Sequence, residues 1–376
     1  MTLNILVGGS GAAPSNKPQK DLPDGNLCKD EIKFPDGRTV WRSNVRPDRI
    51  SFVSYLAANQ FAFPKGHNKT LTDVFSSLLG GLSGAVEGEV GGKAFVPSSG
   101  TRGTFTLPCG PRGAIIYLAL KREKVPGTVV PAFSVRVEFN PRKLQPSGIH
   151  QFLEILEQCF DVPIDVGAFL SNATVTRYDA AVDFVGLCPS ELVATIEKPG
   201  KRLAYFGGDG LLETVQLHKK RATPSKPLQT IKNPLGVLGV KIYDRTRERA
   251  AHGKPAPVPG YAVTRAEVVK TRLGAGFSFA DLLVAEPFKD VRLSYAATAA
   301  PLIEPSVWNL YLAVKASVGD ERATILLGLS GAEAKALKKA FQDHPNTLLS
   351  SLSSAAWQAG IAETGLDQMI ALSLAK

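Results

Sequence analysis

The sequence predicts an α+β fold in which a largely antiparallel sheet carries helices on one face, followed by a small helical C-terminal domain. Two observations predict it. Most segments between residues 46 and 300 alternate apolar and polar side chains with the period of two that half-buried strands show. Beyond about residue 300 the apolar residues recur at helical spacing. We therefore expect a flexible tail over residues 1–45, a central domain over 46–300 and a helical domain over 301–376.

The individual elements follow from local patterns. The expected strands comprise residues 49–55, 114–121, 133–140, 174–185, 202–206, 212–217, 237–245 and 261–270. The clearest helix is expected over 146–160, because Ile149, Phe152 and Leu156 lie at helical spacing after Pro146. Further helices are expected over 190–197, 279–288, 306–316 and 332–341. The glycine-rich stretch 80–103 is expected to form a loop or an irregular hairpin, and the basic stretch 219–235 a loop.

Composition restricts the class of protein. Lys and Arg number 44 against 34 Asp and Glu, giving a formal charge of +10, which favours polyanionic partners. The four cysteines form no Cys-x-x-Cys motif, which argues against a zinc site and a disulfide framework. Neither a signal peptide nor an apolar run of membrane-spanning length is apparent. We expect a protein of the bacterial cytoplasm with no membrane partner.

Four of the expected strands share one design. Each places apolar side chains on one face, while the other face carries a basic residue followed two positions later by a carboxylate or a tyrosine. These pairs are Arg136 with Glu138, Arg177 with Asp179, Lys241 with Tyr243, and Arg265 with Glu267. A sheet with one solvated face and cross-strand ion pairs produces a similar pattern. The repetition in four strands, and the tyrosine among the charges, favour a functional face.

This mixture of residues suits cleavage of a phosphodiester. Carboxylates bind Mg²⁺ or Mn²⁺, which polarises a phosphoryl oxygen, and a tyrosine hydroxyl can attack phosphorus. Asp179 and Asp183 lie roughly 13 Å apart along an extended strand, so both cannot ligate one ion. We favour Asp179, because its offset from the preceding arginine matches those of Glu138 and Glu267. Tyr205 is the second candidate nucleophile.

The strings Arg136-Val-Glu-Phe-Asn-Pro141, Arg177-Tyr-Asp-Ala-Ala-Val-Asp183, Lys241-Ile-Tyr-Asp-Arg-Thr-Arg-Glu248 and Thr264-Arg-Ala-Glu267 occur in that order. Over about residues 46–275 the chain thereby resembles the replication initiation proteins of filamentous phages and related rolling-circle plasmids. The resemblance implies an enzyme that nicks a double-stranded replication origin, becomes linked to the 5′ phosphate and leaves a 3′ hydroxyl. Host helicase and polymerase would be its partners.

The resemblance also implies roles for individual residues. Tyr243 would be the nucleophile, assisted by Lys241 and by Arg245, which stands where the family has lysine. Glu138, Asp179 and Glu267 would bind the Mg²⁺ or Mn²⁺ ion. The expected contacts to the DNA backbone are Arg136, Arg177, Arg247, Arg265, Lys219, Lys220 and Arg221.

Two other classes of protein are weighed against this one. Conjugative relaxases bind metal through a His-hydrophobic-His pair, which this chain lacks, so that class is disfavoured. A non-catalytic, sequence-specific DNA-binding protein, such as a repressor or packaging factor, would use the same basic face. It would show salt-dependent affinity without metal-dependent nicking.

Overall fold

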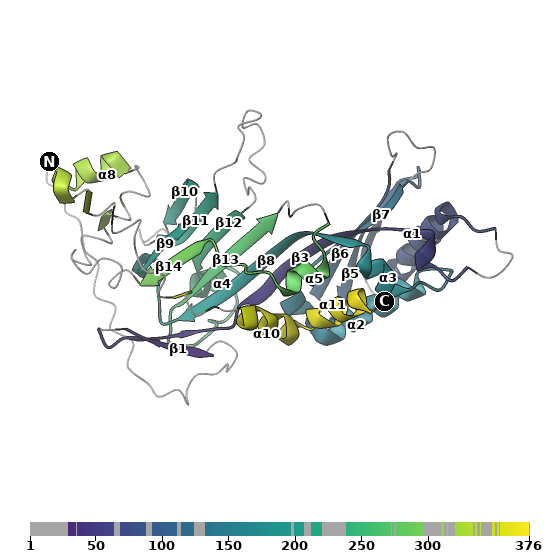
Figure 1. Ribbon diagram of the computed structural model, residues 1–376, viewed down its shortest axis with the longest axis horizontal. Coiled ribbons are helices and arrows are strands. Elements are labelled where there is room, and N and C mark those ends of the chain that lie inside the picture. Colours follow the sequence, from purple (N-terminus) through teal and green to yellow (C-terminus); the bar gives the residue numbers. More distant parts are fainter. Residues whose placement is uncertain are drawn as a thin grey trace.

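A computed structural model describes most of the 376-residue chain. The described residues are 29–34, 36–63, 68–87, 92–110, 114–123, 132–196, 199–206, 212–219, 238–271, 273, 276–295, 310–311, 314, 320–333, 335–336, 339, 348–349, 352 and 354–375. They form the α+β fold that the sequence predicts: one long, antiparallel sheet with helices packed on one face (Figure 1).

The main sheet has twelve strands. Ten of them lie side by side in the order β10-β11-β12-β13-β8-β3-β7-β6-β5-β4, and β1 and β2 form a hairpin attached to β8. The strands are β1 (Asp30–Lys33), β2 (Thr39–Arg42), β3 (Arg46–Tyr55), β4 (Lys93–Phe95), β5 (Arg102–Cys109), β6 (Ala114–Glu123), β7 (Ala132–Phe139), β8 (Ala173–Val185), β10 (Pro199–Phe206), β11 (Leu212–Lys219), β12 (Leu238–Asp244) and β13 (Val263–Thr271). A separate pair is formed by β9 (Leu192–Ile196) and β14 (Val291–Tyr295).

The sheet consists of two halves with the same topology. In the first half the chain runs β3, β5, β6, β7, and these strands lie in the order β3-β7-β6-β5. In the second half it runs β8, β11, β12, β13, and these strands lie in the order β8-β13-β12-β11. The halves meet at the antiparallel pair β3–β8. Antiparallel neighbours in one sheet are related by a two-fold axis perpendicular to it, so equivalent residues of the two halves project from the same face.

Helices cover the apolar face. They are α1 (Leu71–Glu87), α2 (Pro141–Gln158), α3 (Val166–Ser171), α5 (Phe279–Leu283), α10 (Ser354–Thr364) and α11 (Leu366–Leu374). In Figure 1, α2, α10 and α11 lie below the sheet, and α1 lies at the end that holds β5 to β7. Two shorter helices lie elsewhere: α4 (Arg245–Ala251) follows β12, and α8 is Asp320–Leu326. Within the described part of the chain, no helix is long and apolar enough to cross a membrane.

The ends of the chain differ from the expected domain division. Residues 30–42, expected in a tail, form β1 and β2, which pair with each other and with β8. At the other end, α10 and α11 belong to the core of the sheet rather than to a separate domain: Trp357, Ile361 and Met369 are buried in the same apolar cluster as β3 and β8. The indole N–H of Trp357 donates a hydrogen bond to the Leu282 carbonyl at 2.8 Å. Residues 1–28 and most of 296–319 lie outside the described residues.

Two local predictions were wrong. Residues 190–197 were expected to be helical but form a short 3-10 turn (Pro189–Glu191) and then strand β9. The glycine-rich start of the stretch 80–103 was expected to form a loop but belongs to α1. The basic loop 219–235 and the expected helix 306–316 fall almost wholly outside the described residues.

Candidate functional site

The residues expected to carry chemistry meet at one end of the sheet, on the face opposite the helices. There the carboxyl ends of β8 and β12 lie beside the amino ends of β3 and β13. Cross-strand pairing aligns Tyr243 with Arg265, and Arg265 with Asp183. Two residues further along the same pair of strands, on the same face, Lys241 is aligned with Glu267. Four of the five residues were singled out from sequence as site residues, and the topology brings them together.

Asp183 is the electrostatic anchor of this region. Its side chain is 2% exposed, and both of its oxygens accept hydrogen bonds from Arg265, at 2.7 and 2.8 Å. Arg46 donates a third, at 3.1 Å. Burial alone would raise the pKa of Asp183, but the charges of Arg265 and Arg46 outweigh it and hold this pKa well below its usual range. Asp183 is therefore a structural carboxylate, with both oxygens engaged by arginines.

Arginines gather near Asp183, although Arg265 also pairs with Asp48 at 3.5 Å and Arg245 pairs with Glu248 at 3.0 Å. We call Arg46, Arg142, Arg245 and Arg265 the arginine cluster. Arg142, the second residue of α2, forms no ion pair among the described residues, although the negative charge of Asp183 acts on it. Burial, together with the positive charges of Arg46 and Arg265, lowers the pKa of Arg142 to about 10. A partly buried guanidinium surrounded by like charges is a group that an anion, such as a phosphate, would stabilise.

Carboxylates gather beside the arginines. We call Asp48, Asp179 and Glu267 the acidic cluster. Burial raises the pKa of Glu267, and the negative charge of Asp48 raises it further. Burial also raises the pKa of Asp179, against the opposing effect of Arg177. Mutual repulsion among buried carboxylates is the situation that a bound cation relieves.

The charges of both the arginine cluster and the acidic cluster act on Tyr243. Its hydroxyl is positioned to donate to Glu267 Oε2 at 3.5 Å, a long hydrogen bond. Burial raises the pKa of Tyr243 to about 12; Arg265 opposes the shift, and Glu267 adds to it. The phenol is therefore protonated at neutral pH, and any nucleophilic role requires a group that takes its proton.

The carboxylates that could bind a divalent ion differ in whether an arginine already pairs with them. Arg177 donates to both oxygens of Asp179, at 2.8 and 2.6 Å, and Glu138 is ion-paired with Arg49 and Arg136. No ion pair involving Glu267 occurs in the described part of the chain. No group of three or more His, Cys, Asp or Glu side chains suited to a metal ion is found among the described residues. Asp48 is ion-paired with Arg265 at 3.5 Å, so Glu267 is the one of these four acids without an ion pair in the described part of the chain. Mg²⁺ commonly uses one or two carboxylates plus water and substrate phosphate.

Glu138 is not brought into the acidic cluster. It lies on β7, two strands from Asp179, whereas Asp48 occupies the place beside Asp179 and Glu267. Arg136, on the same strand, is 53% exposed and accessible to a ligand. Arg265 is 2% exposed and committed to Asp183, so it supports the site rather than presenting a surface for DNA.

Arg245 departs from its expected place. It was expected to continue the face of Lys241 and Tyr243 on one strand, but β12 ends at Asp244. The carboxylate of Asp244 accepts a hydrogen bond from the Arg247 backbone N–H at 3.0 Å and caps α4, so Arg245 begins a helix. Its charge still lowers the pKa of Tyr243, so Arg245 remains near the site. Arg247 is ion-paired with Asp244 at 3.6 Å.

Other predicted residues are only partly described. Tyr205 is aligned through Thr214 with Tyr243, two strands away, but its side chain lies outside the described set. The side chain of Lys219 lies outside it as well, as do Lys220 and Arg221 entirely.

Three residues of the site were missed in the sequence: Arg46, Asp48 and Arg142. A signal for two of them was present. The first strand of each half contains an Arg-x-Asp tripeptide: Arg46-Pro-Asp48 in β3 and Arg177-Tyr-Asp179 in β8. The last strand of each half contains an Arg-x-Glu tripeptide: Arg136-Val-Glu138 in β7 and Arg265-Ala-Glu267 in β13. Each half thus has an Arg-x-Asp first strand and an Arg-x-Glu last strand.

Comparison with known proteins identifies no relative. The chain matches no protein-family model, and no curated protein is significantly similar to it.

Proposed function

We propose that this protein is a metal-dependent endonuclease that nicks one DNA strand at a specific origin and so initiates rolling-circle replication. The observation that supports it best is the setting of Tyr243, whose hydroxyl points at Glu267 in the acidic cluster while the arginine cluster lies alongside. A nucleophile, a proton acceptor and positive charge for a phosphate are the groups that strand cleavage by tyrosine requires.

The proposed reaction is an energy-conserving transesterification. The Tyr243 hydroxyl oxygen attacks phosphorus and loses its proton to Glu267. A bond forms between phosphorus and the phenolic oxygen, and the bond from phosphorus to the 3′ oxygen breaks. The departing oxygen takes up a proton and becomes a free 3′ hydroxyl, while the 5′ phosphate remains linked to Tyr243. No external energy source is needed, because one phosphodiester replaces another.

Other residues of the site would bind the scissile phosphate and the metal ion. Arg142 and Arg245 would hold the scissile phosphate and offset its developing charge. Lys241, aligned opposite Glu267, lowers the pKa of that carboxyl and so limits how strongly it retains a proton. Asp48, which also contacts Arg265, and the Glu267 oxygen that does not face Tyr243 would hold Mg²⁺ or Mn²⁺, which when bound polarises a phosphoryl oxygen. The 3′ hydroxyl would serve a host polymerase in the bacterial cytoplasm, with a host helicase unwinding the duplex.

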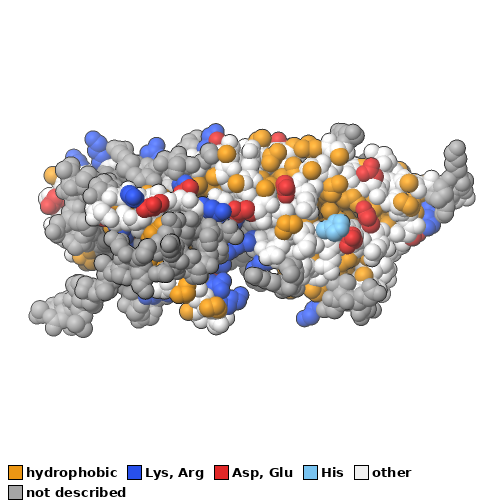
Figure 2. All heavy atoms as spheres, turned by 90° about the horizontal axis from the view of Figure 1, so that it is seen from below, with side chains coloured by type: hydrophobic (Ala, Val, Ile, Leu, Met, Phe, Trp, Pro, Cys, Tyr) orange, Lys and Arg blue, Asp and Glu red, His pale blue; other side chains and the backbone are white. Residues whose placement is uncertain are grey.

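The side bearing the helices is less suited to a polyanion. Viewed from that side, the half of the molecule away from the grey residues carries mainly apolar, uncharged and acidic side chains, with lysines and arginines toward its margins (Figure 2). The proposal therefore places DNA on the opposite face, where Tyr243 and Arg136 lie.

The decisive experiment is nicking of a supercoiled plasmid that carries the origin of the source replicon, with Mg²⁺ or Mn²⁺. We expect wild type to give open circles with protein attached to a 5′ end, and Tyr243→Phe to bind the plasmid without cutting it. Tyr55→Phe is the matched control, because it removes the hydroxyl of another exposed tyrosine of the sheet and leaves the nucleophile intact. Cleavage by Tyr243→Phe would reject this nucleophile and leave Tyr205 as the next candidate.

One observation favours the second candidate function, a non-catalytic sequence-specific DNA-binding protein. Arginines already neutralise Asp179 and Glu138, two of the three acids expected to bind metal. If wild type and Tyr243→Phe both bind the origin and neither nicks it with any divalent metal, this second function replaces the first.

A further inference from the structure

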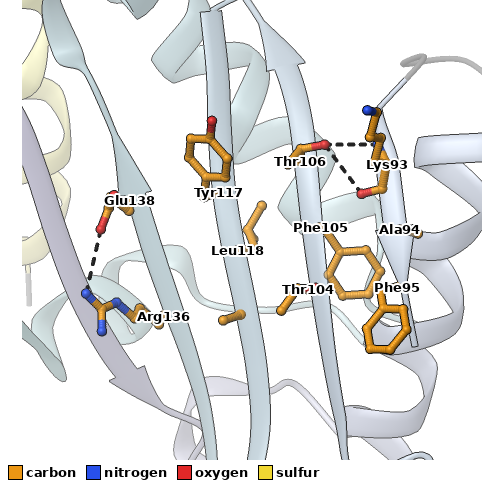
Figure 3. A pocket seen from close by; sticks show the side chains of 11 residues that line it. Lys93, Ala94, Phe95, Thr104, Phe105, Thr106, Tyr117, Leu118, Arg136 and Glu138 are labelled. Carbon is orange, nitrogen blue, oxygen red and sulfur yellow. Dashed lines mark hydrogen bonds and ion pairs between the residues drawn. The ribbon is translucent and has the colours of Figure 1, made fainter. Parts of the chain in front are cut away.

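The first half of the sheet contains a pocket on the same face as Tyr243. It is an open cavity of about 570 Å³ formed across β4, β5, β6 and β7. Figure 3 shows its lining side chains arranged across these four strands, from Lys93 and Phe95 through Tyr117 to Arg136 and Glu138. None of these residues enters the proposed chemistry, although Arg136 and Glu138 were expected from the sequence to be site residues.

The lining combines exposed aromatic rings with cations. Phe95 is 63% exposed and Tyr117 51%, although large aromatic side chains usually lie in the core. Lys93 and Arg136 are exposed in the same pocket, and Thr104 and Thr106 add hydroxyl groups between the rings. Exposed rings with neighbouring positive charge are the features with which proteins hold single-stranded nucleic acid: bases stack on the rings, and cations contact phosphates.

The duplicated topology relates this pocket to the nucleophile. Tyr117 is aligned with Glu138 as Lys241 is aligned with Glu267, and Ala119 is aligned with Arg136 as Tyr243 is with Arg265. The first half therefore has alanine where the second half has the proposed nucleophile. This copy of the site retains polar and aromatic groups for binding but has no hydroxyl at that position to attack a phosphate.

The two sites are continuous across the sheet. Cross-strand pairing aligns Lys93, Thr106, Tyr117, Glu138, Ser51 and Arg177, and Arg177 donates to Asp179 of the acidic cluster. Five strand spacings separate β12 from β6, about 24 Å at about 4.8 Å per spacing. The rows of Tyr243 and Tyr117 are also offset along β8 by the six residues from Arg177 to Asp183, about 20 Å, so the two tyrosines lie about 31 Å apart. A nucleic-acid strand held at Tyr243 would reach the pocket along this face within several nucleotides.

We propose that this pocket binds the single-stranded DNA that flanks the nick, with bases stacked on Phe95 and Tyr117 and phosphates at Lys93 and Arg136. The proposal rests on the proposed function for its choice of DNA. It makes the first half a holding site for the strand that the second half cuts.

Binding to single-stranded DNA tests this without any cleavage. Fluorescence anisotropy would measure the affinity of the full chain for a labelled oligothymidylate and for an abasic oligomer of the same length, without divalent metal. We expect wild type to prefer the oligothymidylate, and a Phe95→Ala/Tyr117→Ala variant to bind it about tenfold more weakly or worse. The variant should bind the abasic oligomer as wild type does.

Matched variants separate stacking from folding and charge. Val284→Ala truncates an exposed apolar side chain outside the pocket and should leave both affinities unchanged. A Phe95→Tyr/Tyr117→Phe variant keeps both rings and should retain the preference for bases. Lys93→Ala should weaken binding to both oligomers, because it removes a phosphate contact.

Three outcomes overturn the proposal: the alanine variant keeps the wild-type preference, wild type fails to bind the oligothymidylate, or wild type binds an oligouridylate more tightly. If the preference depends on the rings but the plasmid is never nicked, the pocket stands and only the proposed cleavage falls.

Discussion

At the scale of single residues, charge around Tyr243 is compensated unevenly. Asp183 is held by Arg265 and Arg46, whereas Arg142 forms no ion pair among the described residues. A partly buried charge without an ion-pair partner is destabilising, and a bound anion would reduce that cost. The site thus divides into an ion-paired framework, built on Asp183, and a positive remainder that suits a phosphate.

The first residue-scale prediction concerns Arg142. We expect Arg142→Gln to weaken binding to single-stranded DNA and to reduce the slope of log affinity against log salt by about 0.7, the value for one phosphate contact. Stability should change by less than about 1 kcal/mol, because the change removes a cation that other arginines repel. Anisotropy titrations over a range of salt concentrations and urea unfolding would measure both. Lys289→Gln, an exposed cation outside the site, is the control, and an unchanged slope in Arg142→Gln would reject the phosphate contact.

The second concerns Asp183. We expect Asp183→Asn to lower the free energy of unfolding by about 3–5 kcal/mol at neutral pH, because it leaves Arg265 and Arg46 buried without their carboxylate. The pKa of Asp183 is lowered in the folded protein, so its contribution is present above the ordinary aspartate pKa of about 4 and is lost as pH falls below it.

The difference between wild type and Asp183→Asn should therefore shrink in acid. Urea unfolding at several pH values would measure it. Asp161→Asn breaks a surface ion pair with Lys69 and should cost less than about 1 kcal/mol at any pH. A small, pH-independent effect of Asp183→Asn would contradict the anchoring role.

At the scale of elements, the alternation of apolar and polar residues predicts where the strands lie and which face each side chain occupies. The four strands with a basic residue followed two positions later by a carboxylate or a tyrosine were placed correctly, and so was the face on which those residues lie, because a period of two determines both. Alternation says nothing of which strands become neighbours. For this reason Glu138 and Asp179 were expected in one metal site, whereas the strand order places Asp48 beside Asp179 and Glu267.

Helix α1 was missed for a different physical reason. Gly80, Gly81 and Gly84 lower helix propensity, and propensity is a weak guide where packing decides. A Cβ atom on Gly81 would lie 2.6 Å from the Cys159 carbonyl oxygen, at the end of α2, so glycine permits the close approach of the two helices. The glycine that obscures the helix in the sequence is thus one that the packing of the helix requires.

This leads to a prediction at the element scale. We expect Gly81→Ala to destabilise the protein by about 1–3 kcal/mol, because the added methyl group meets backbone atoms of Cys159. Gly84→Ala is the matched control on the same helix: its Cβ would meet no atom within 4 Å, so it should stabilise by about 0.5–1 kcal/mol. Thermal and urea unfolding would measure both. Equal effects at the two positions would show that propensity, rather than the contact with Cys159, controls α1.

At the scale of the whole molecule, the duplicated topology explains why one face carries two kinds of site. Both halves keep an Arg-x-Asp and an Arg-x-Glu strand, but the second has Tyr243 where the first has Ala119. Comparison of the halves, rather than of single strands, would have drawn attention to Asp48 in the sequence. Repeats this divergent emerge only when strand order shows which residues are equivalent.

The C-terminal helices bury the centre of the sheet, where the two halves join. Trp357 is 1% exposed and packs against Tyr178, and α10 contacts β3. Trp357→Ala should therefore lower the free energy of unfolding by about 3–5 kcal/mol, and a chain lacking residues 354–376 should lose the cooperative unfolding of the sheet. Far-UV circular dichroism in urea would follow both, with Leu374→Ala, at an exposed site on α11, as control. A separate helical domain would behave differently: its removal would leave the unfolding transition of the sheet in place, and that result would restore the domain division expected from the sequence.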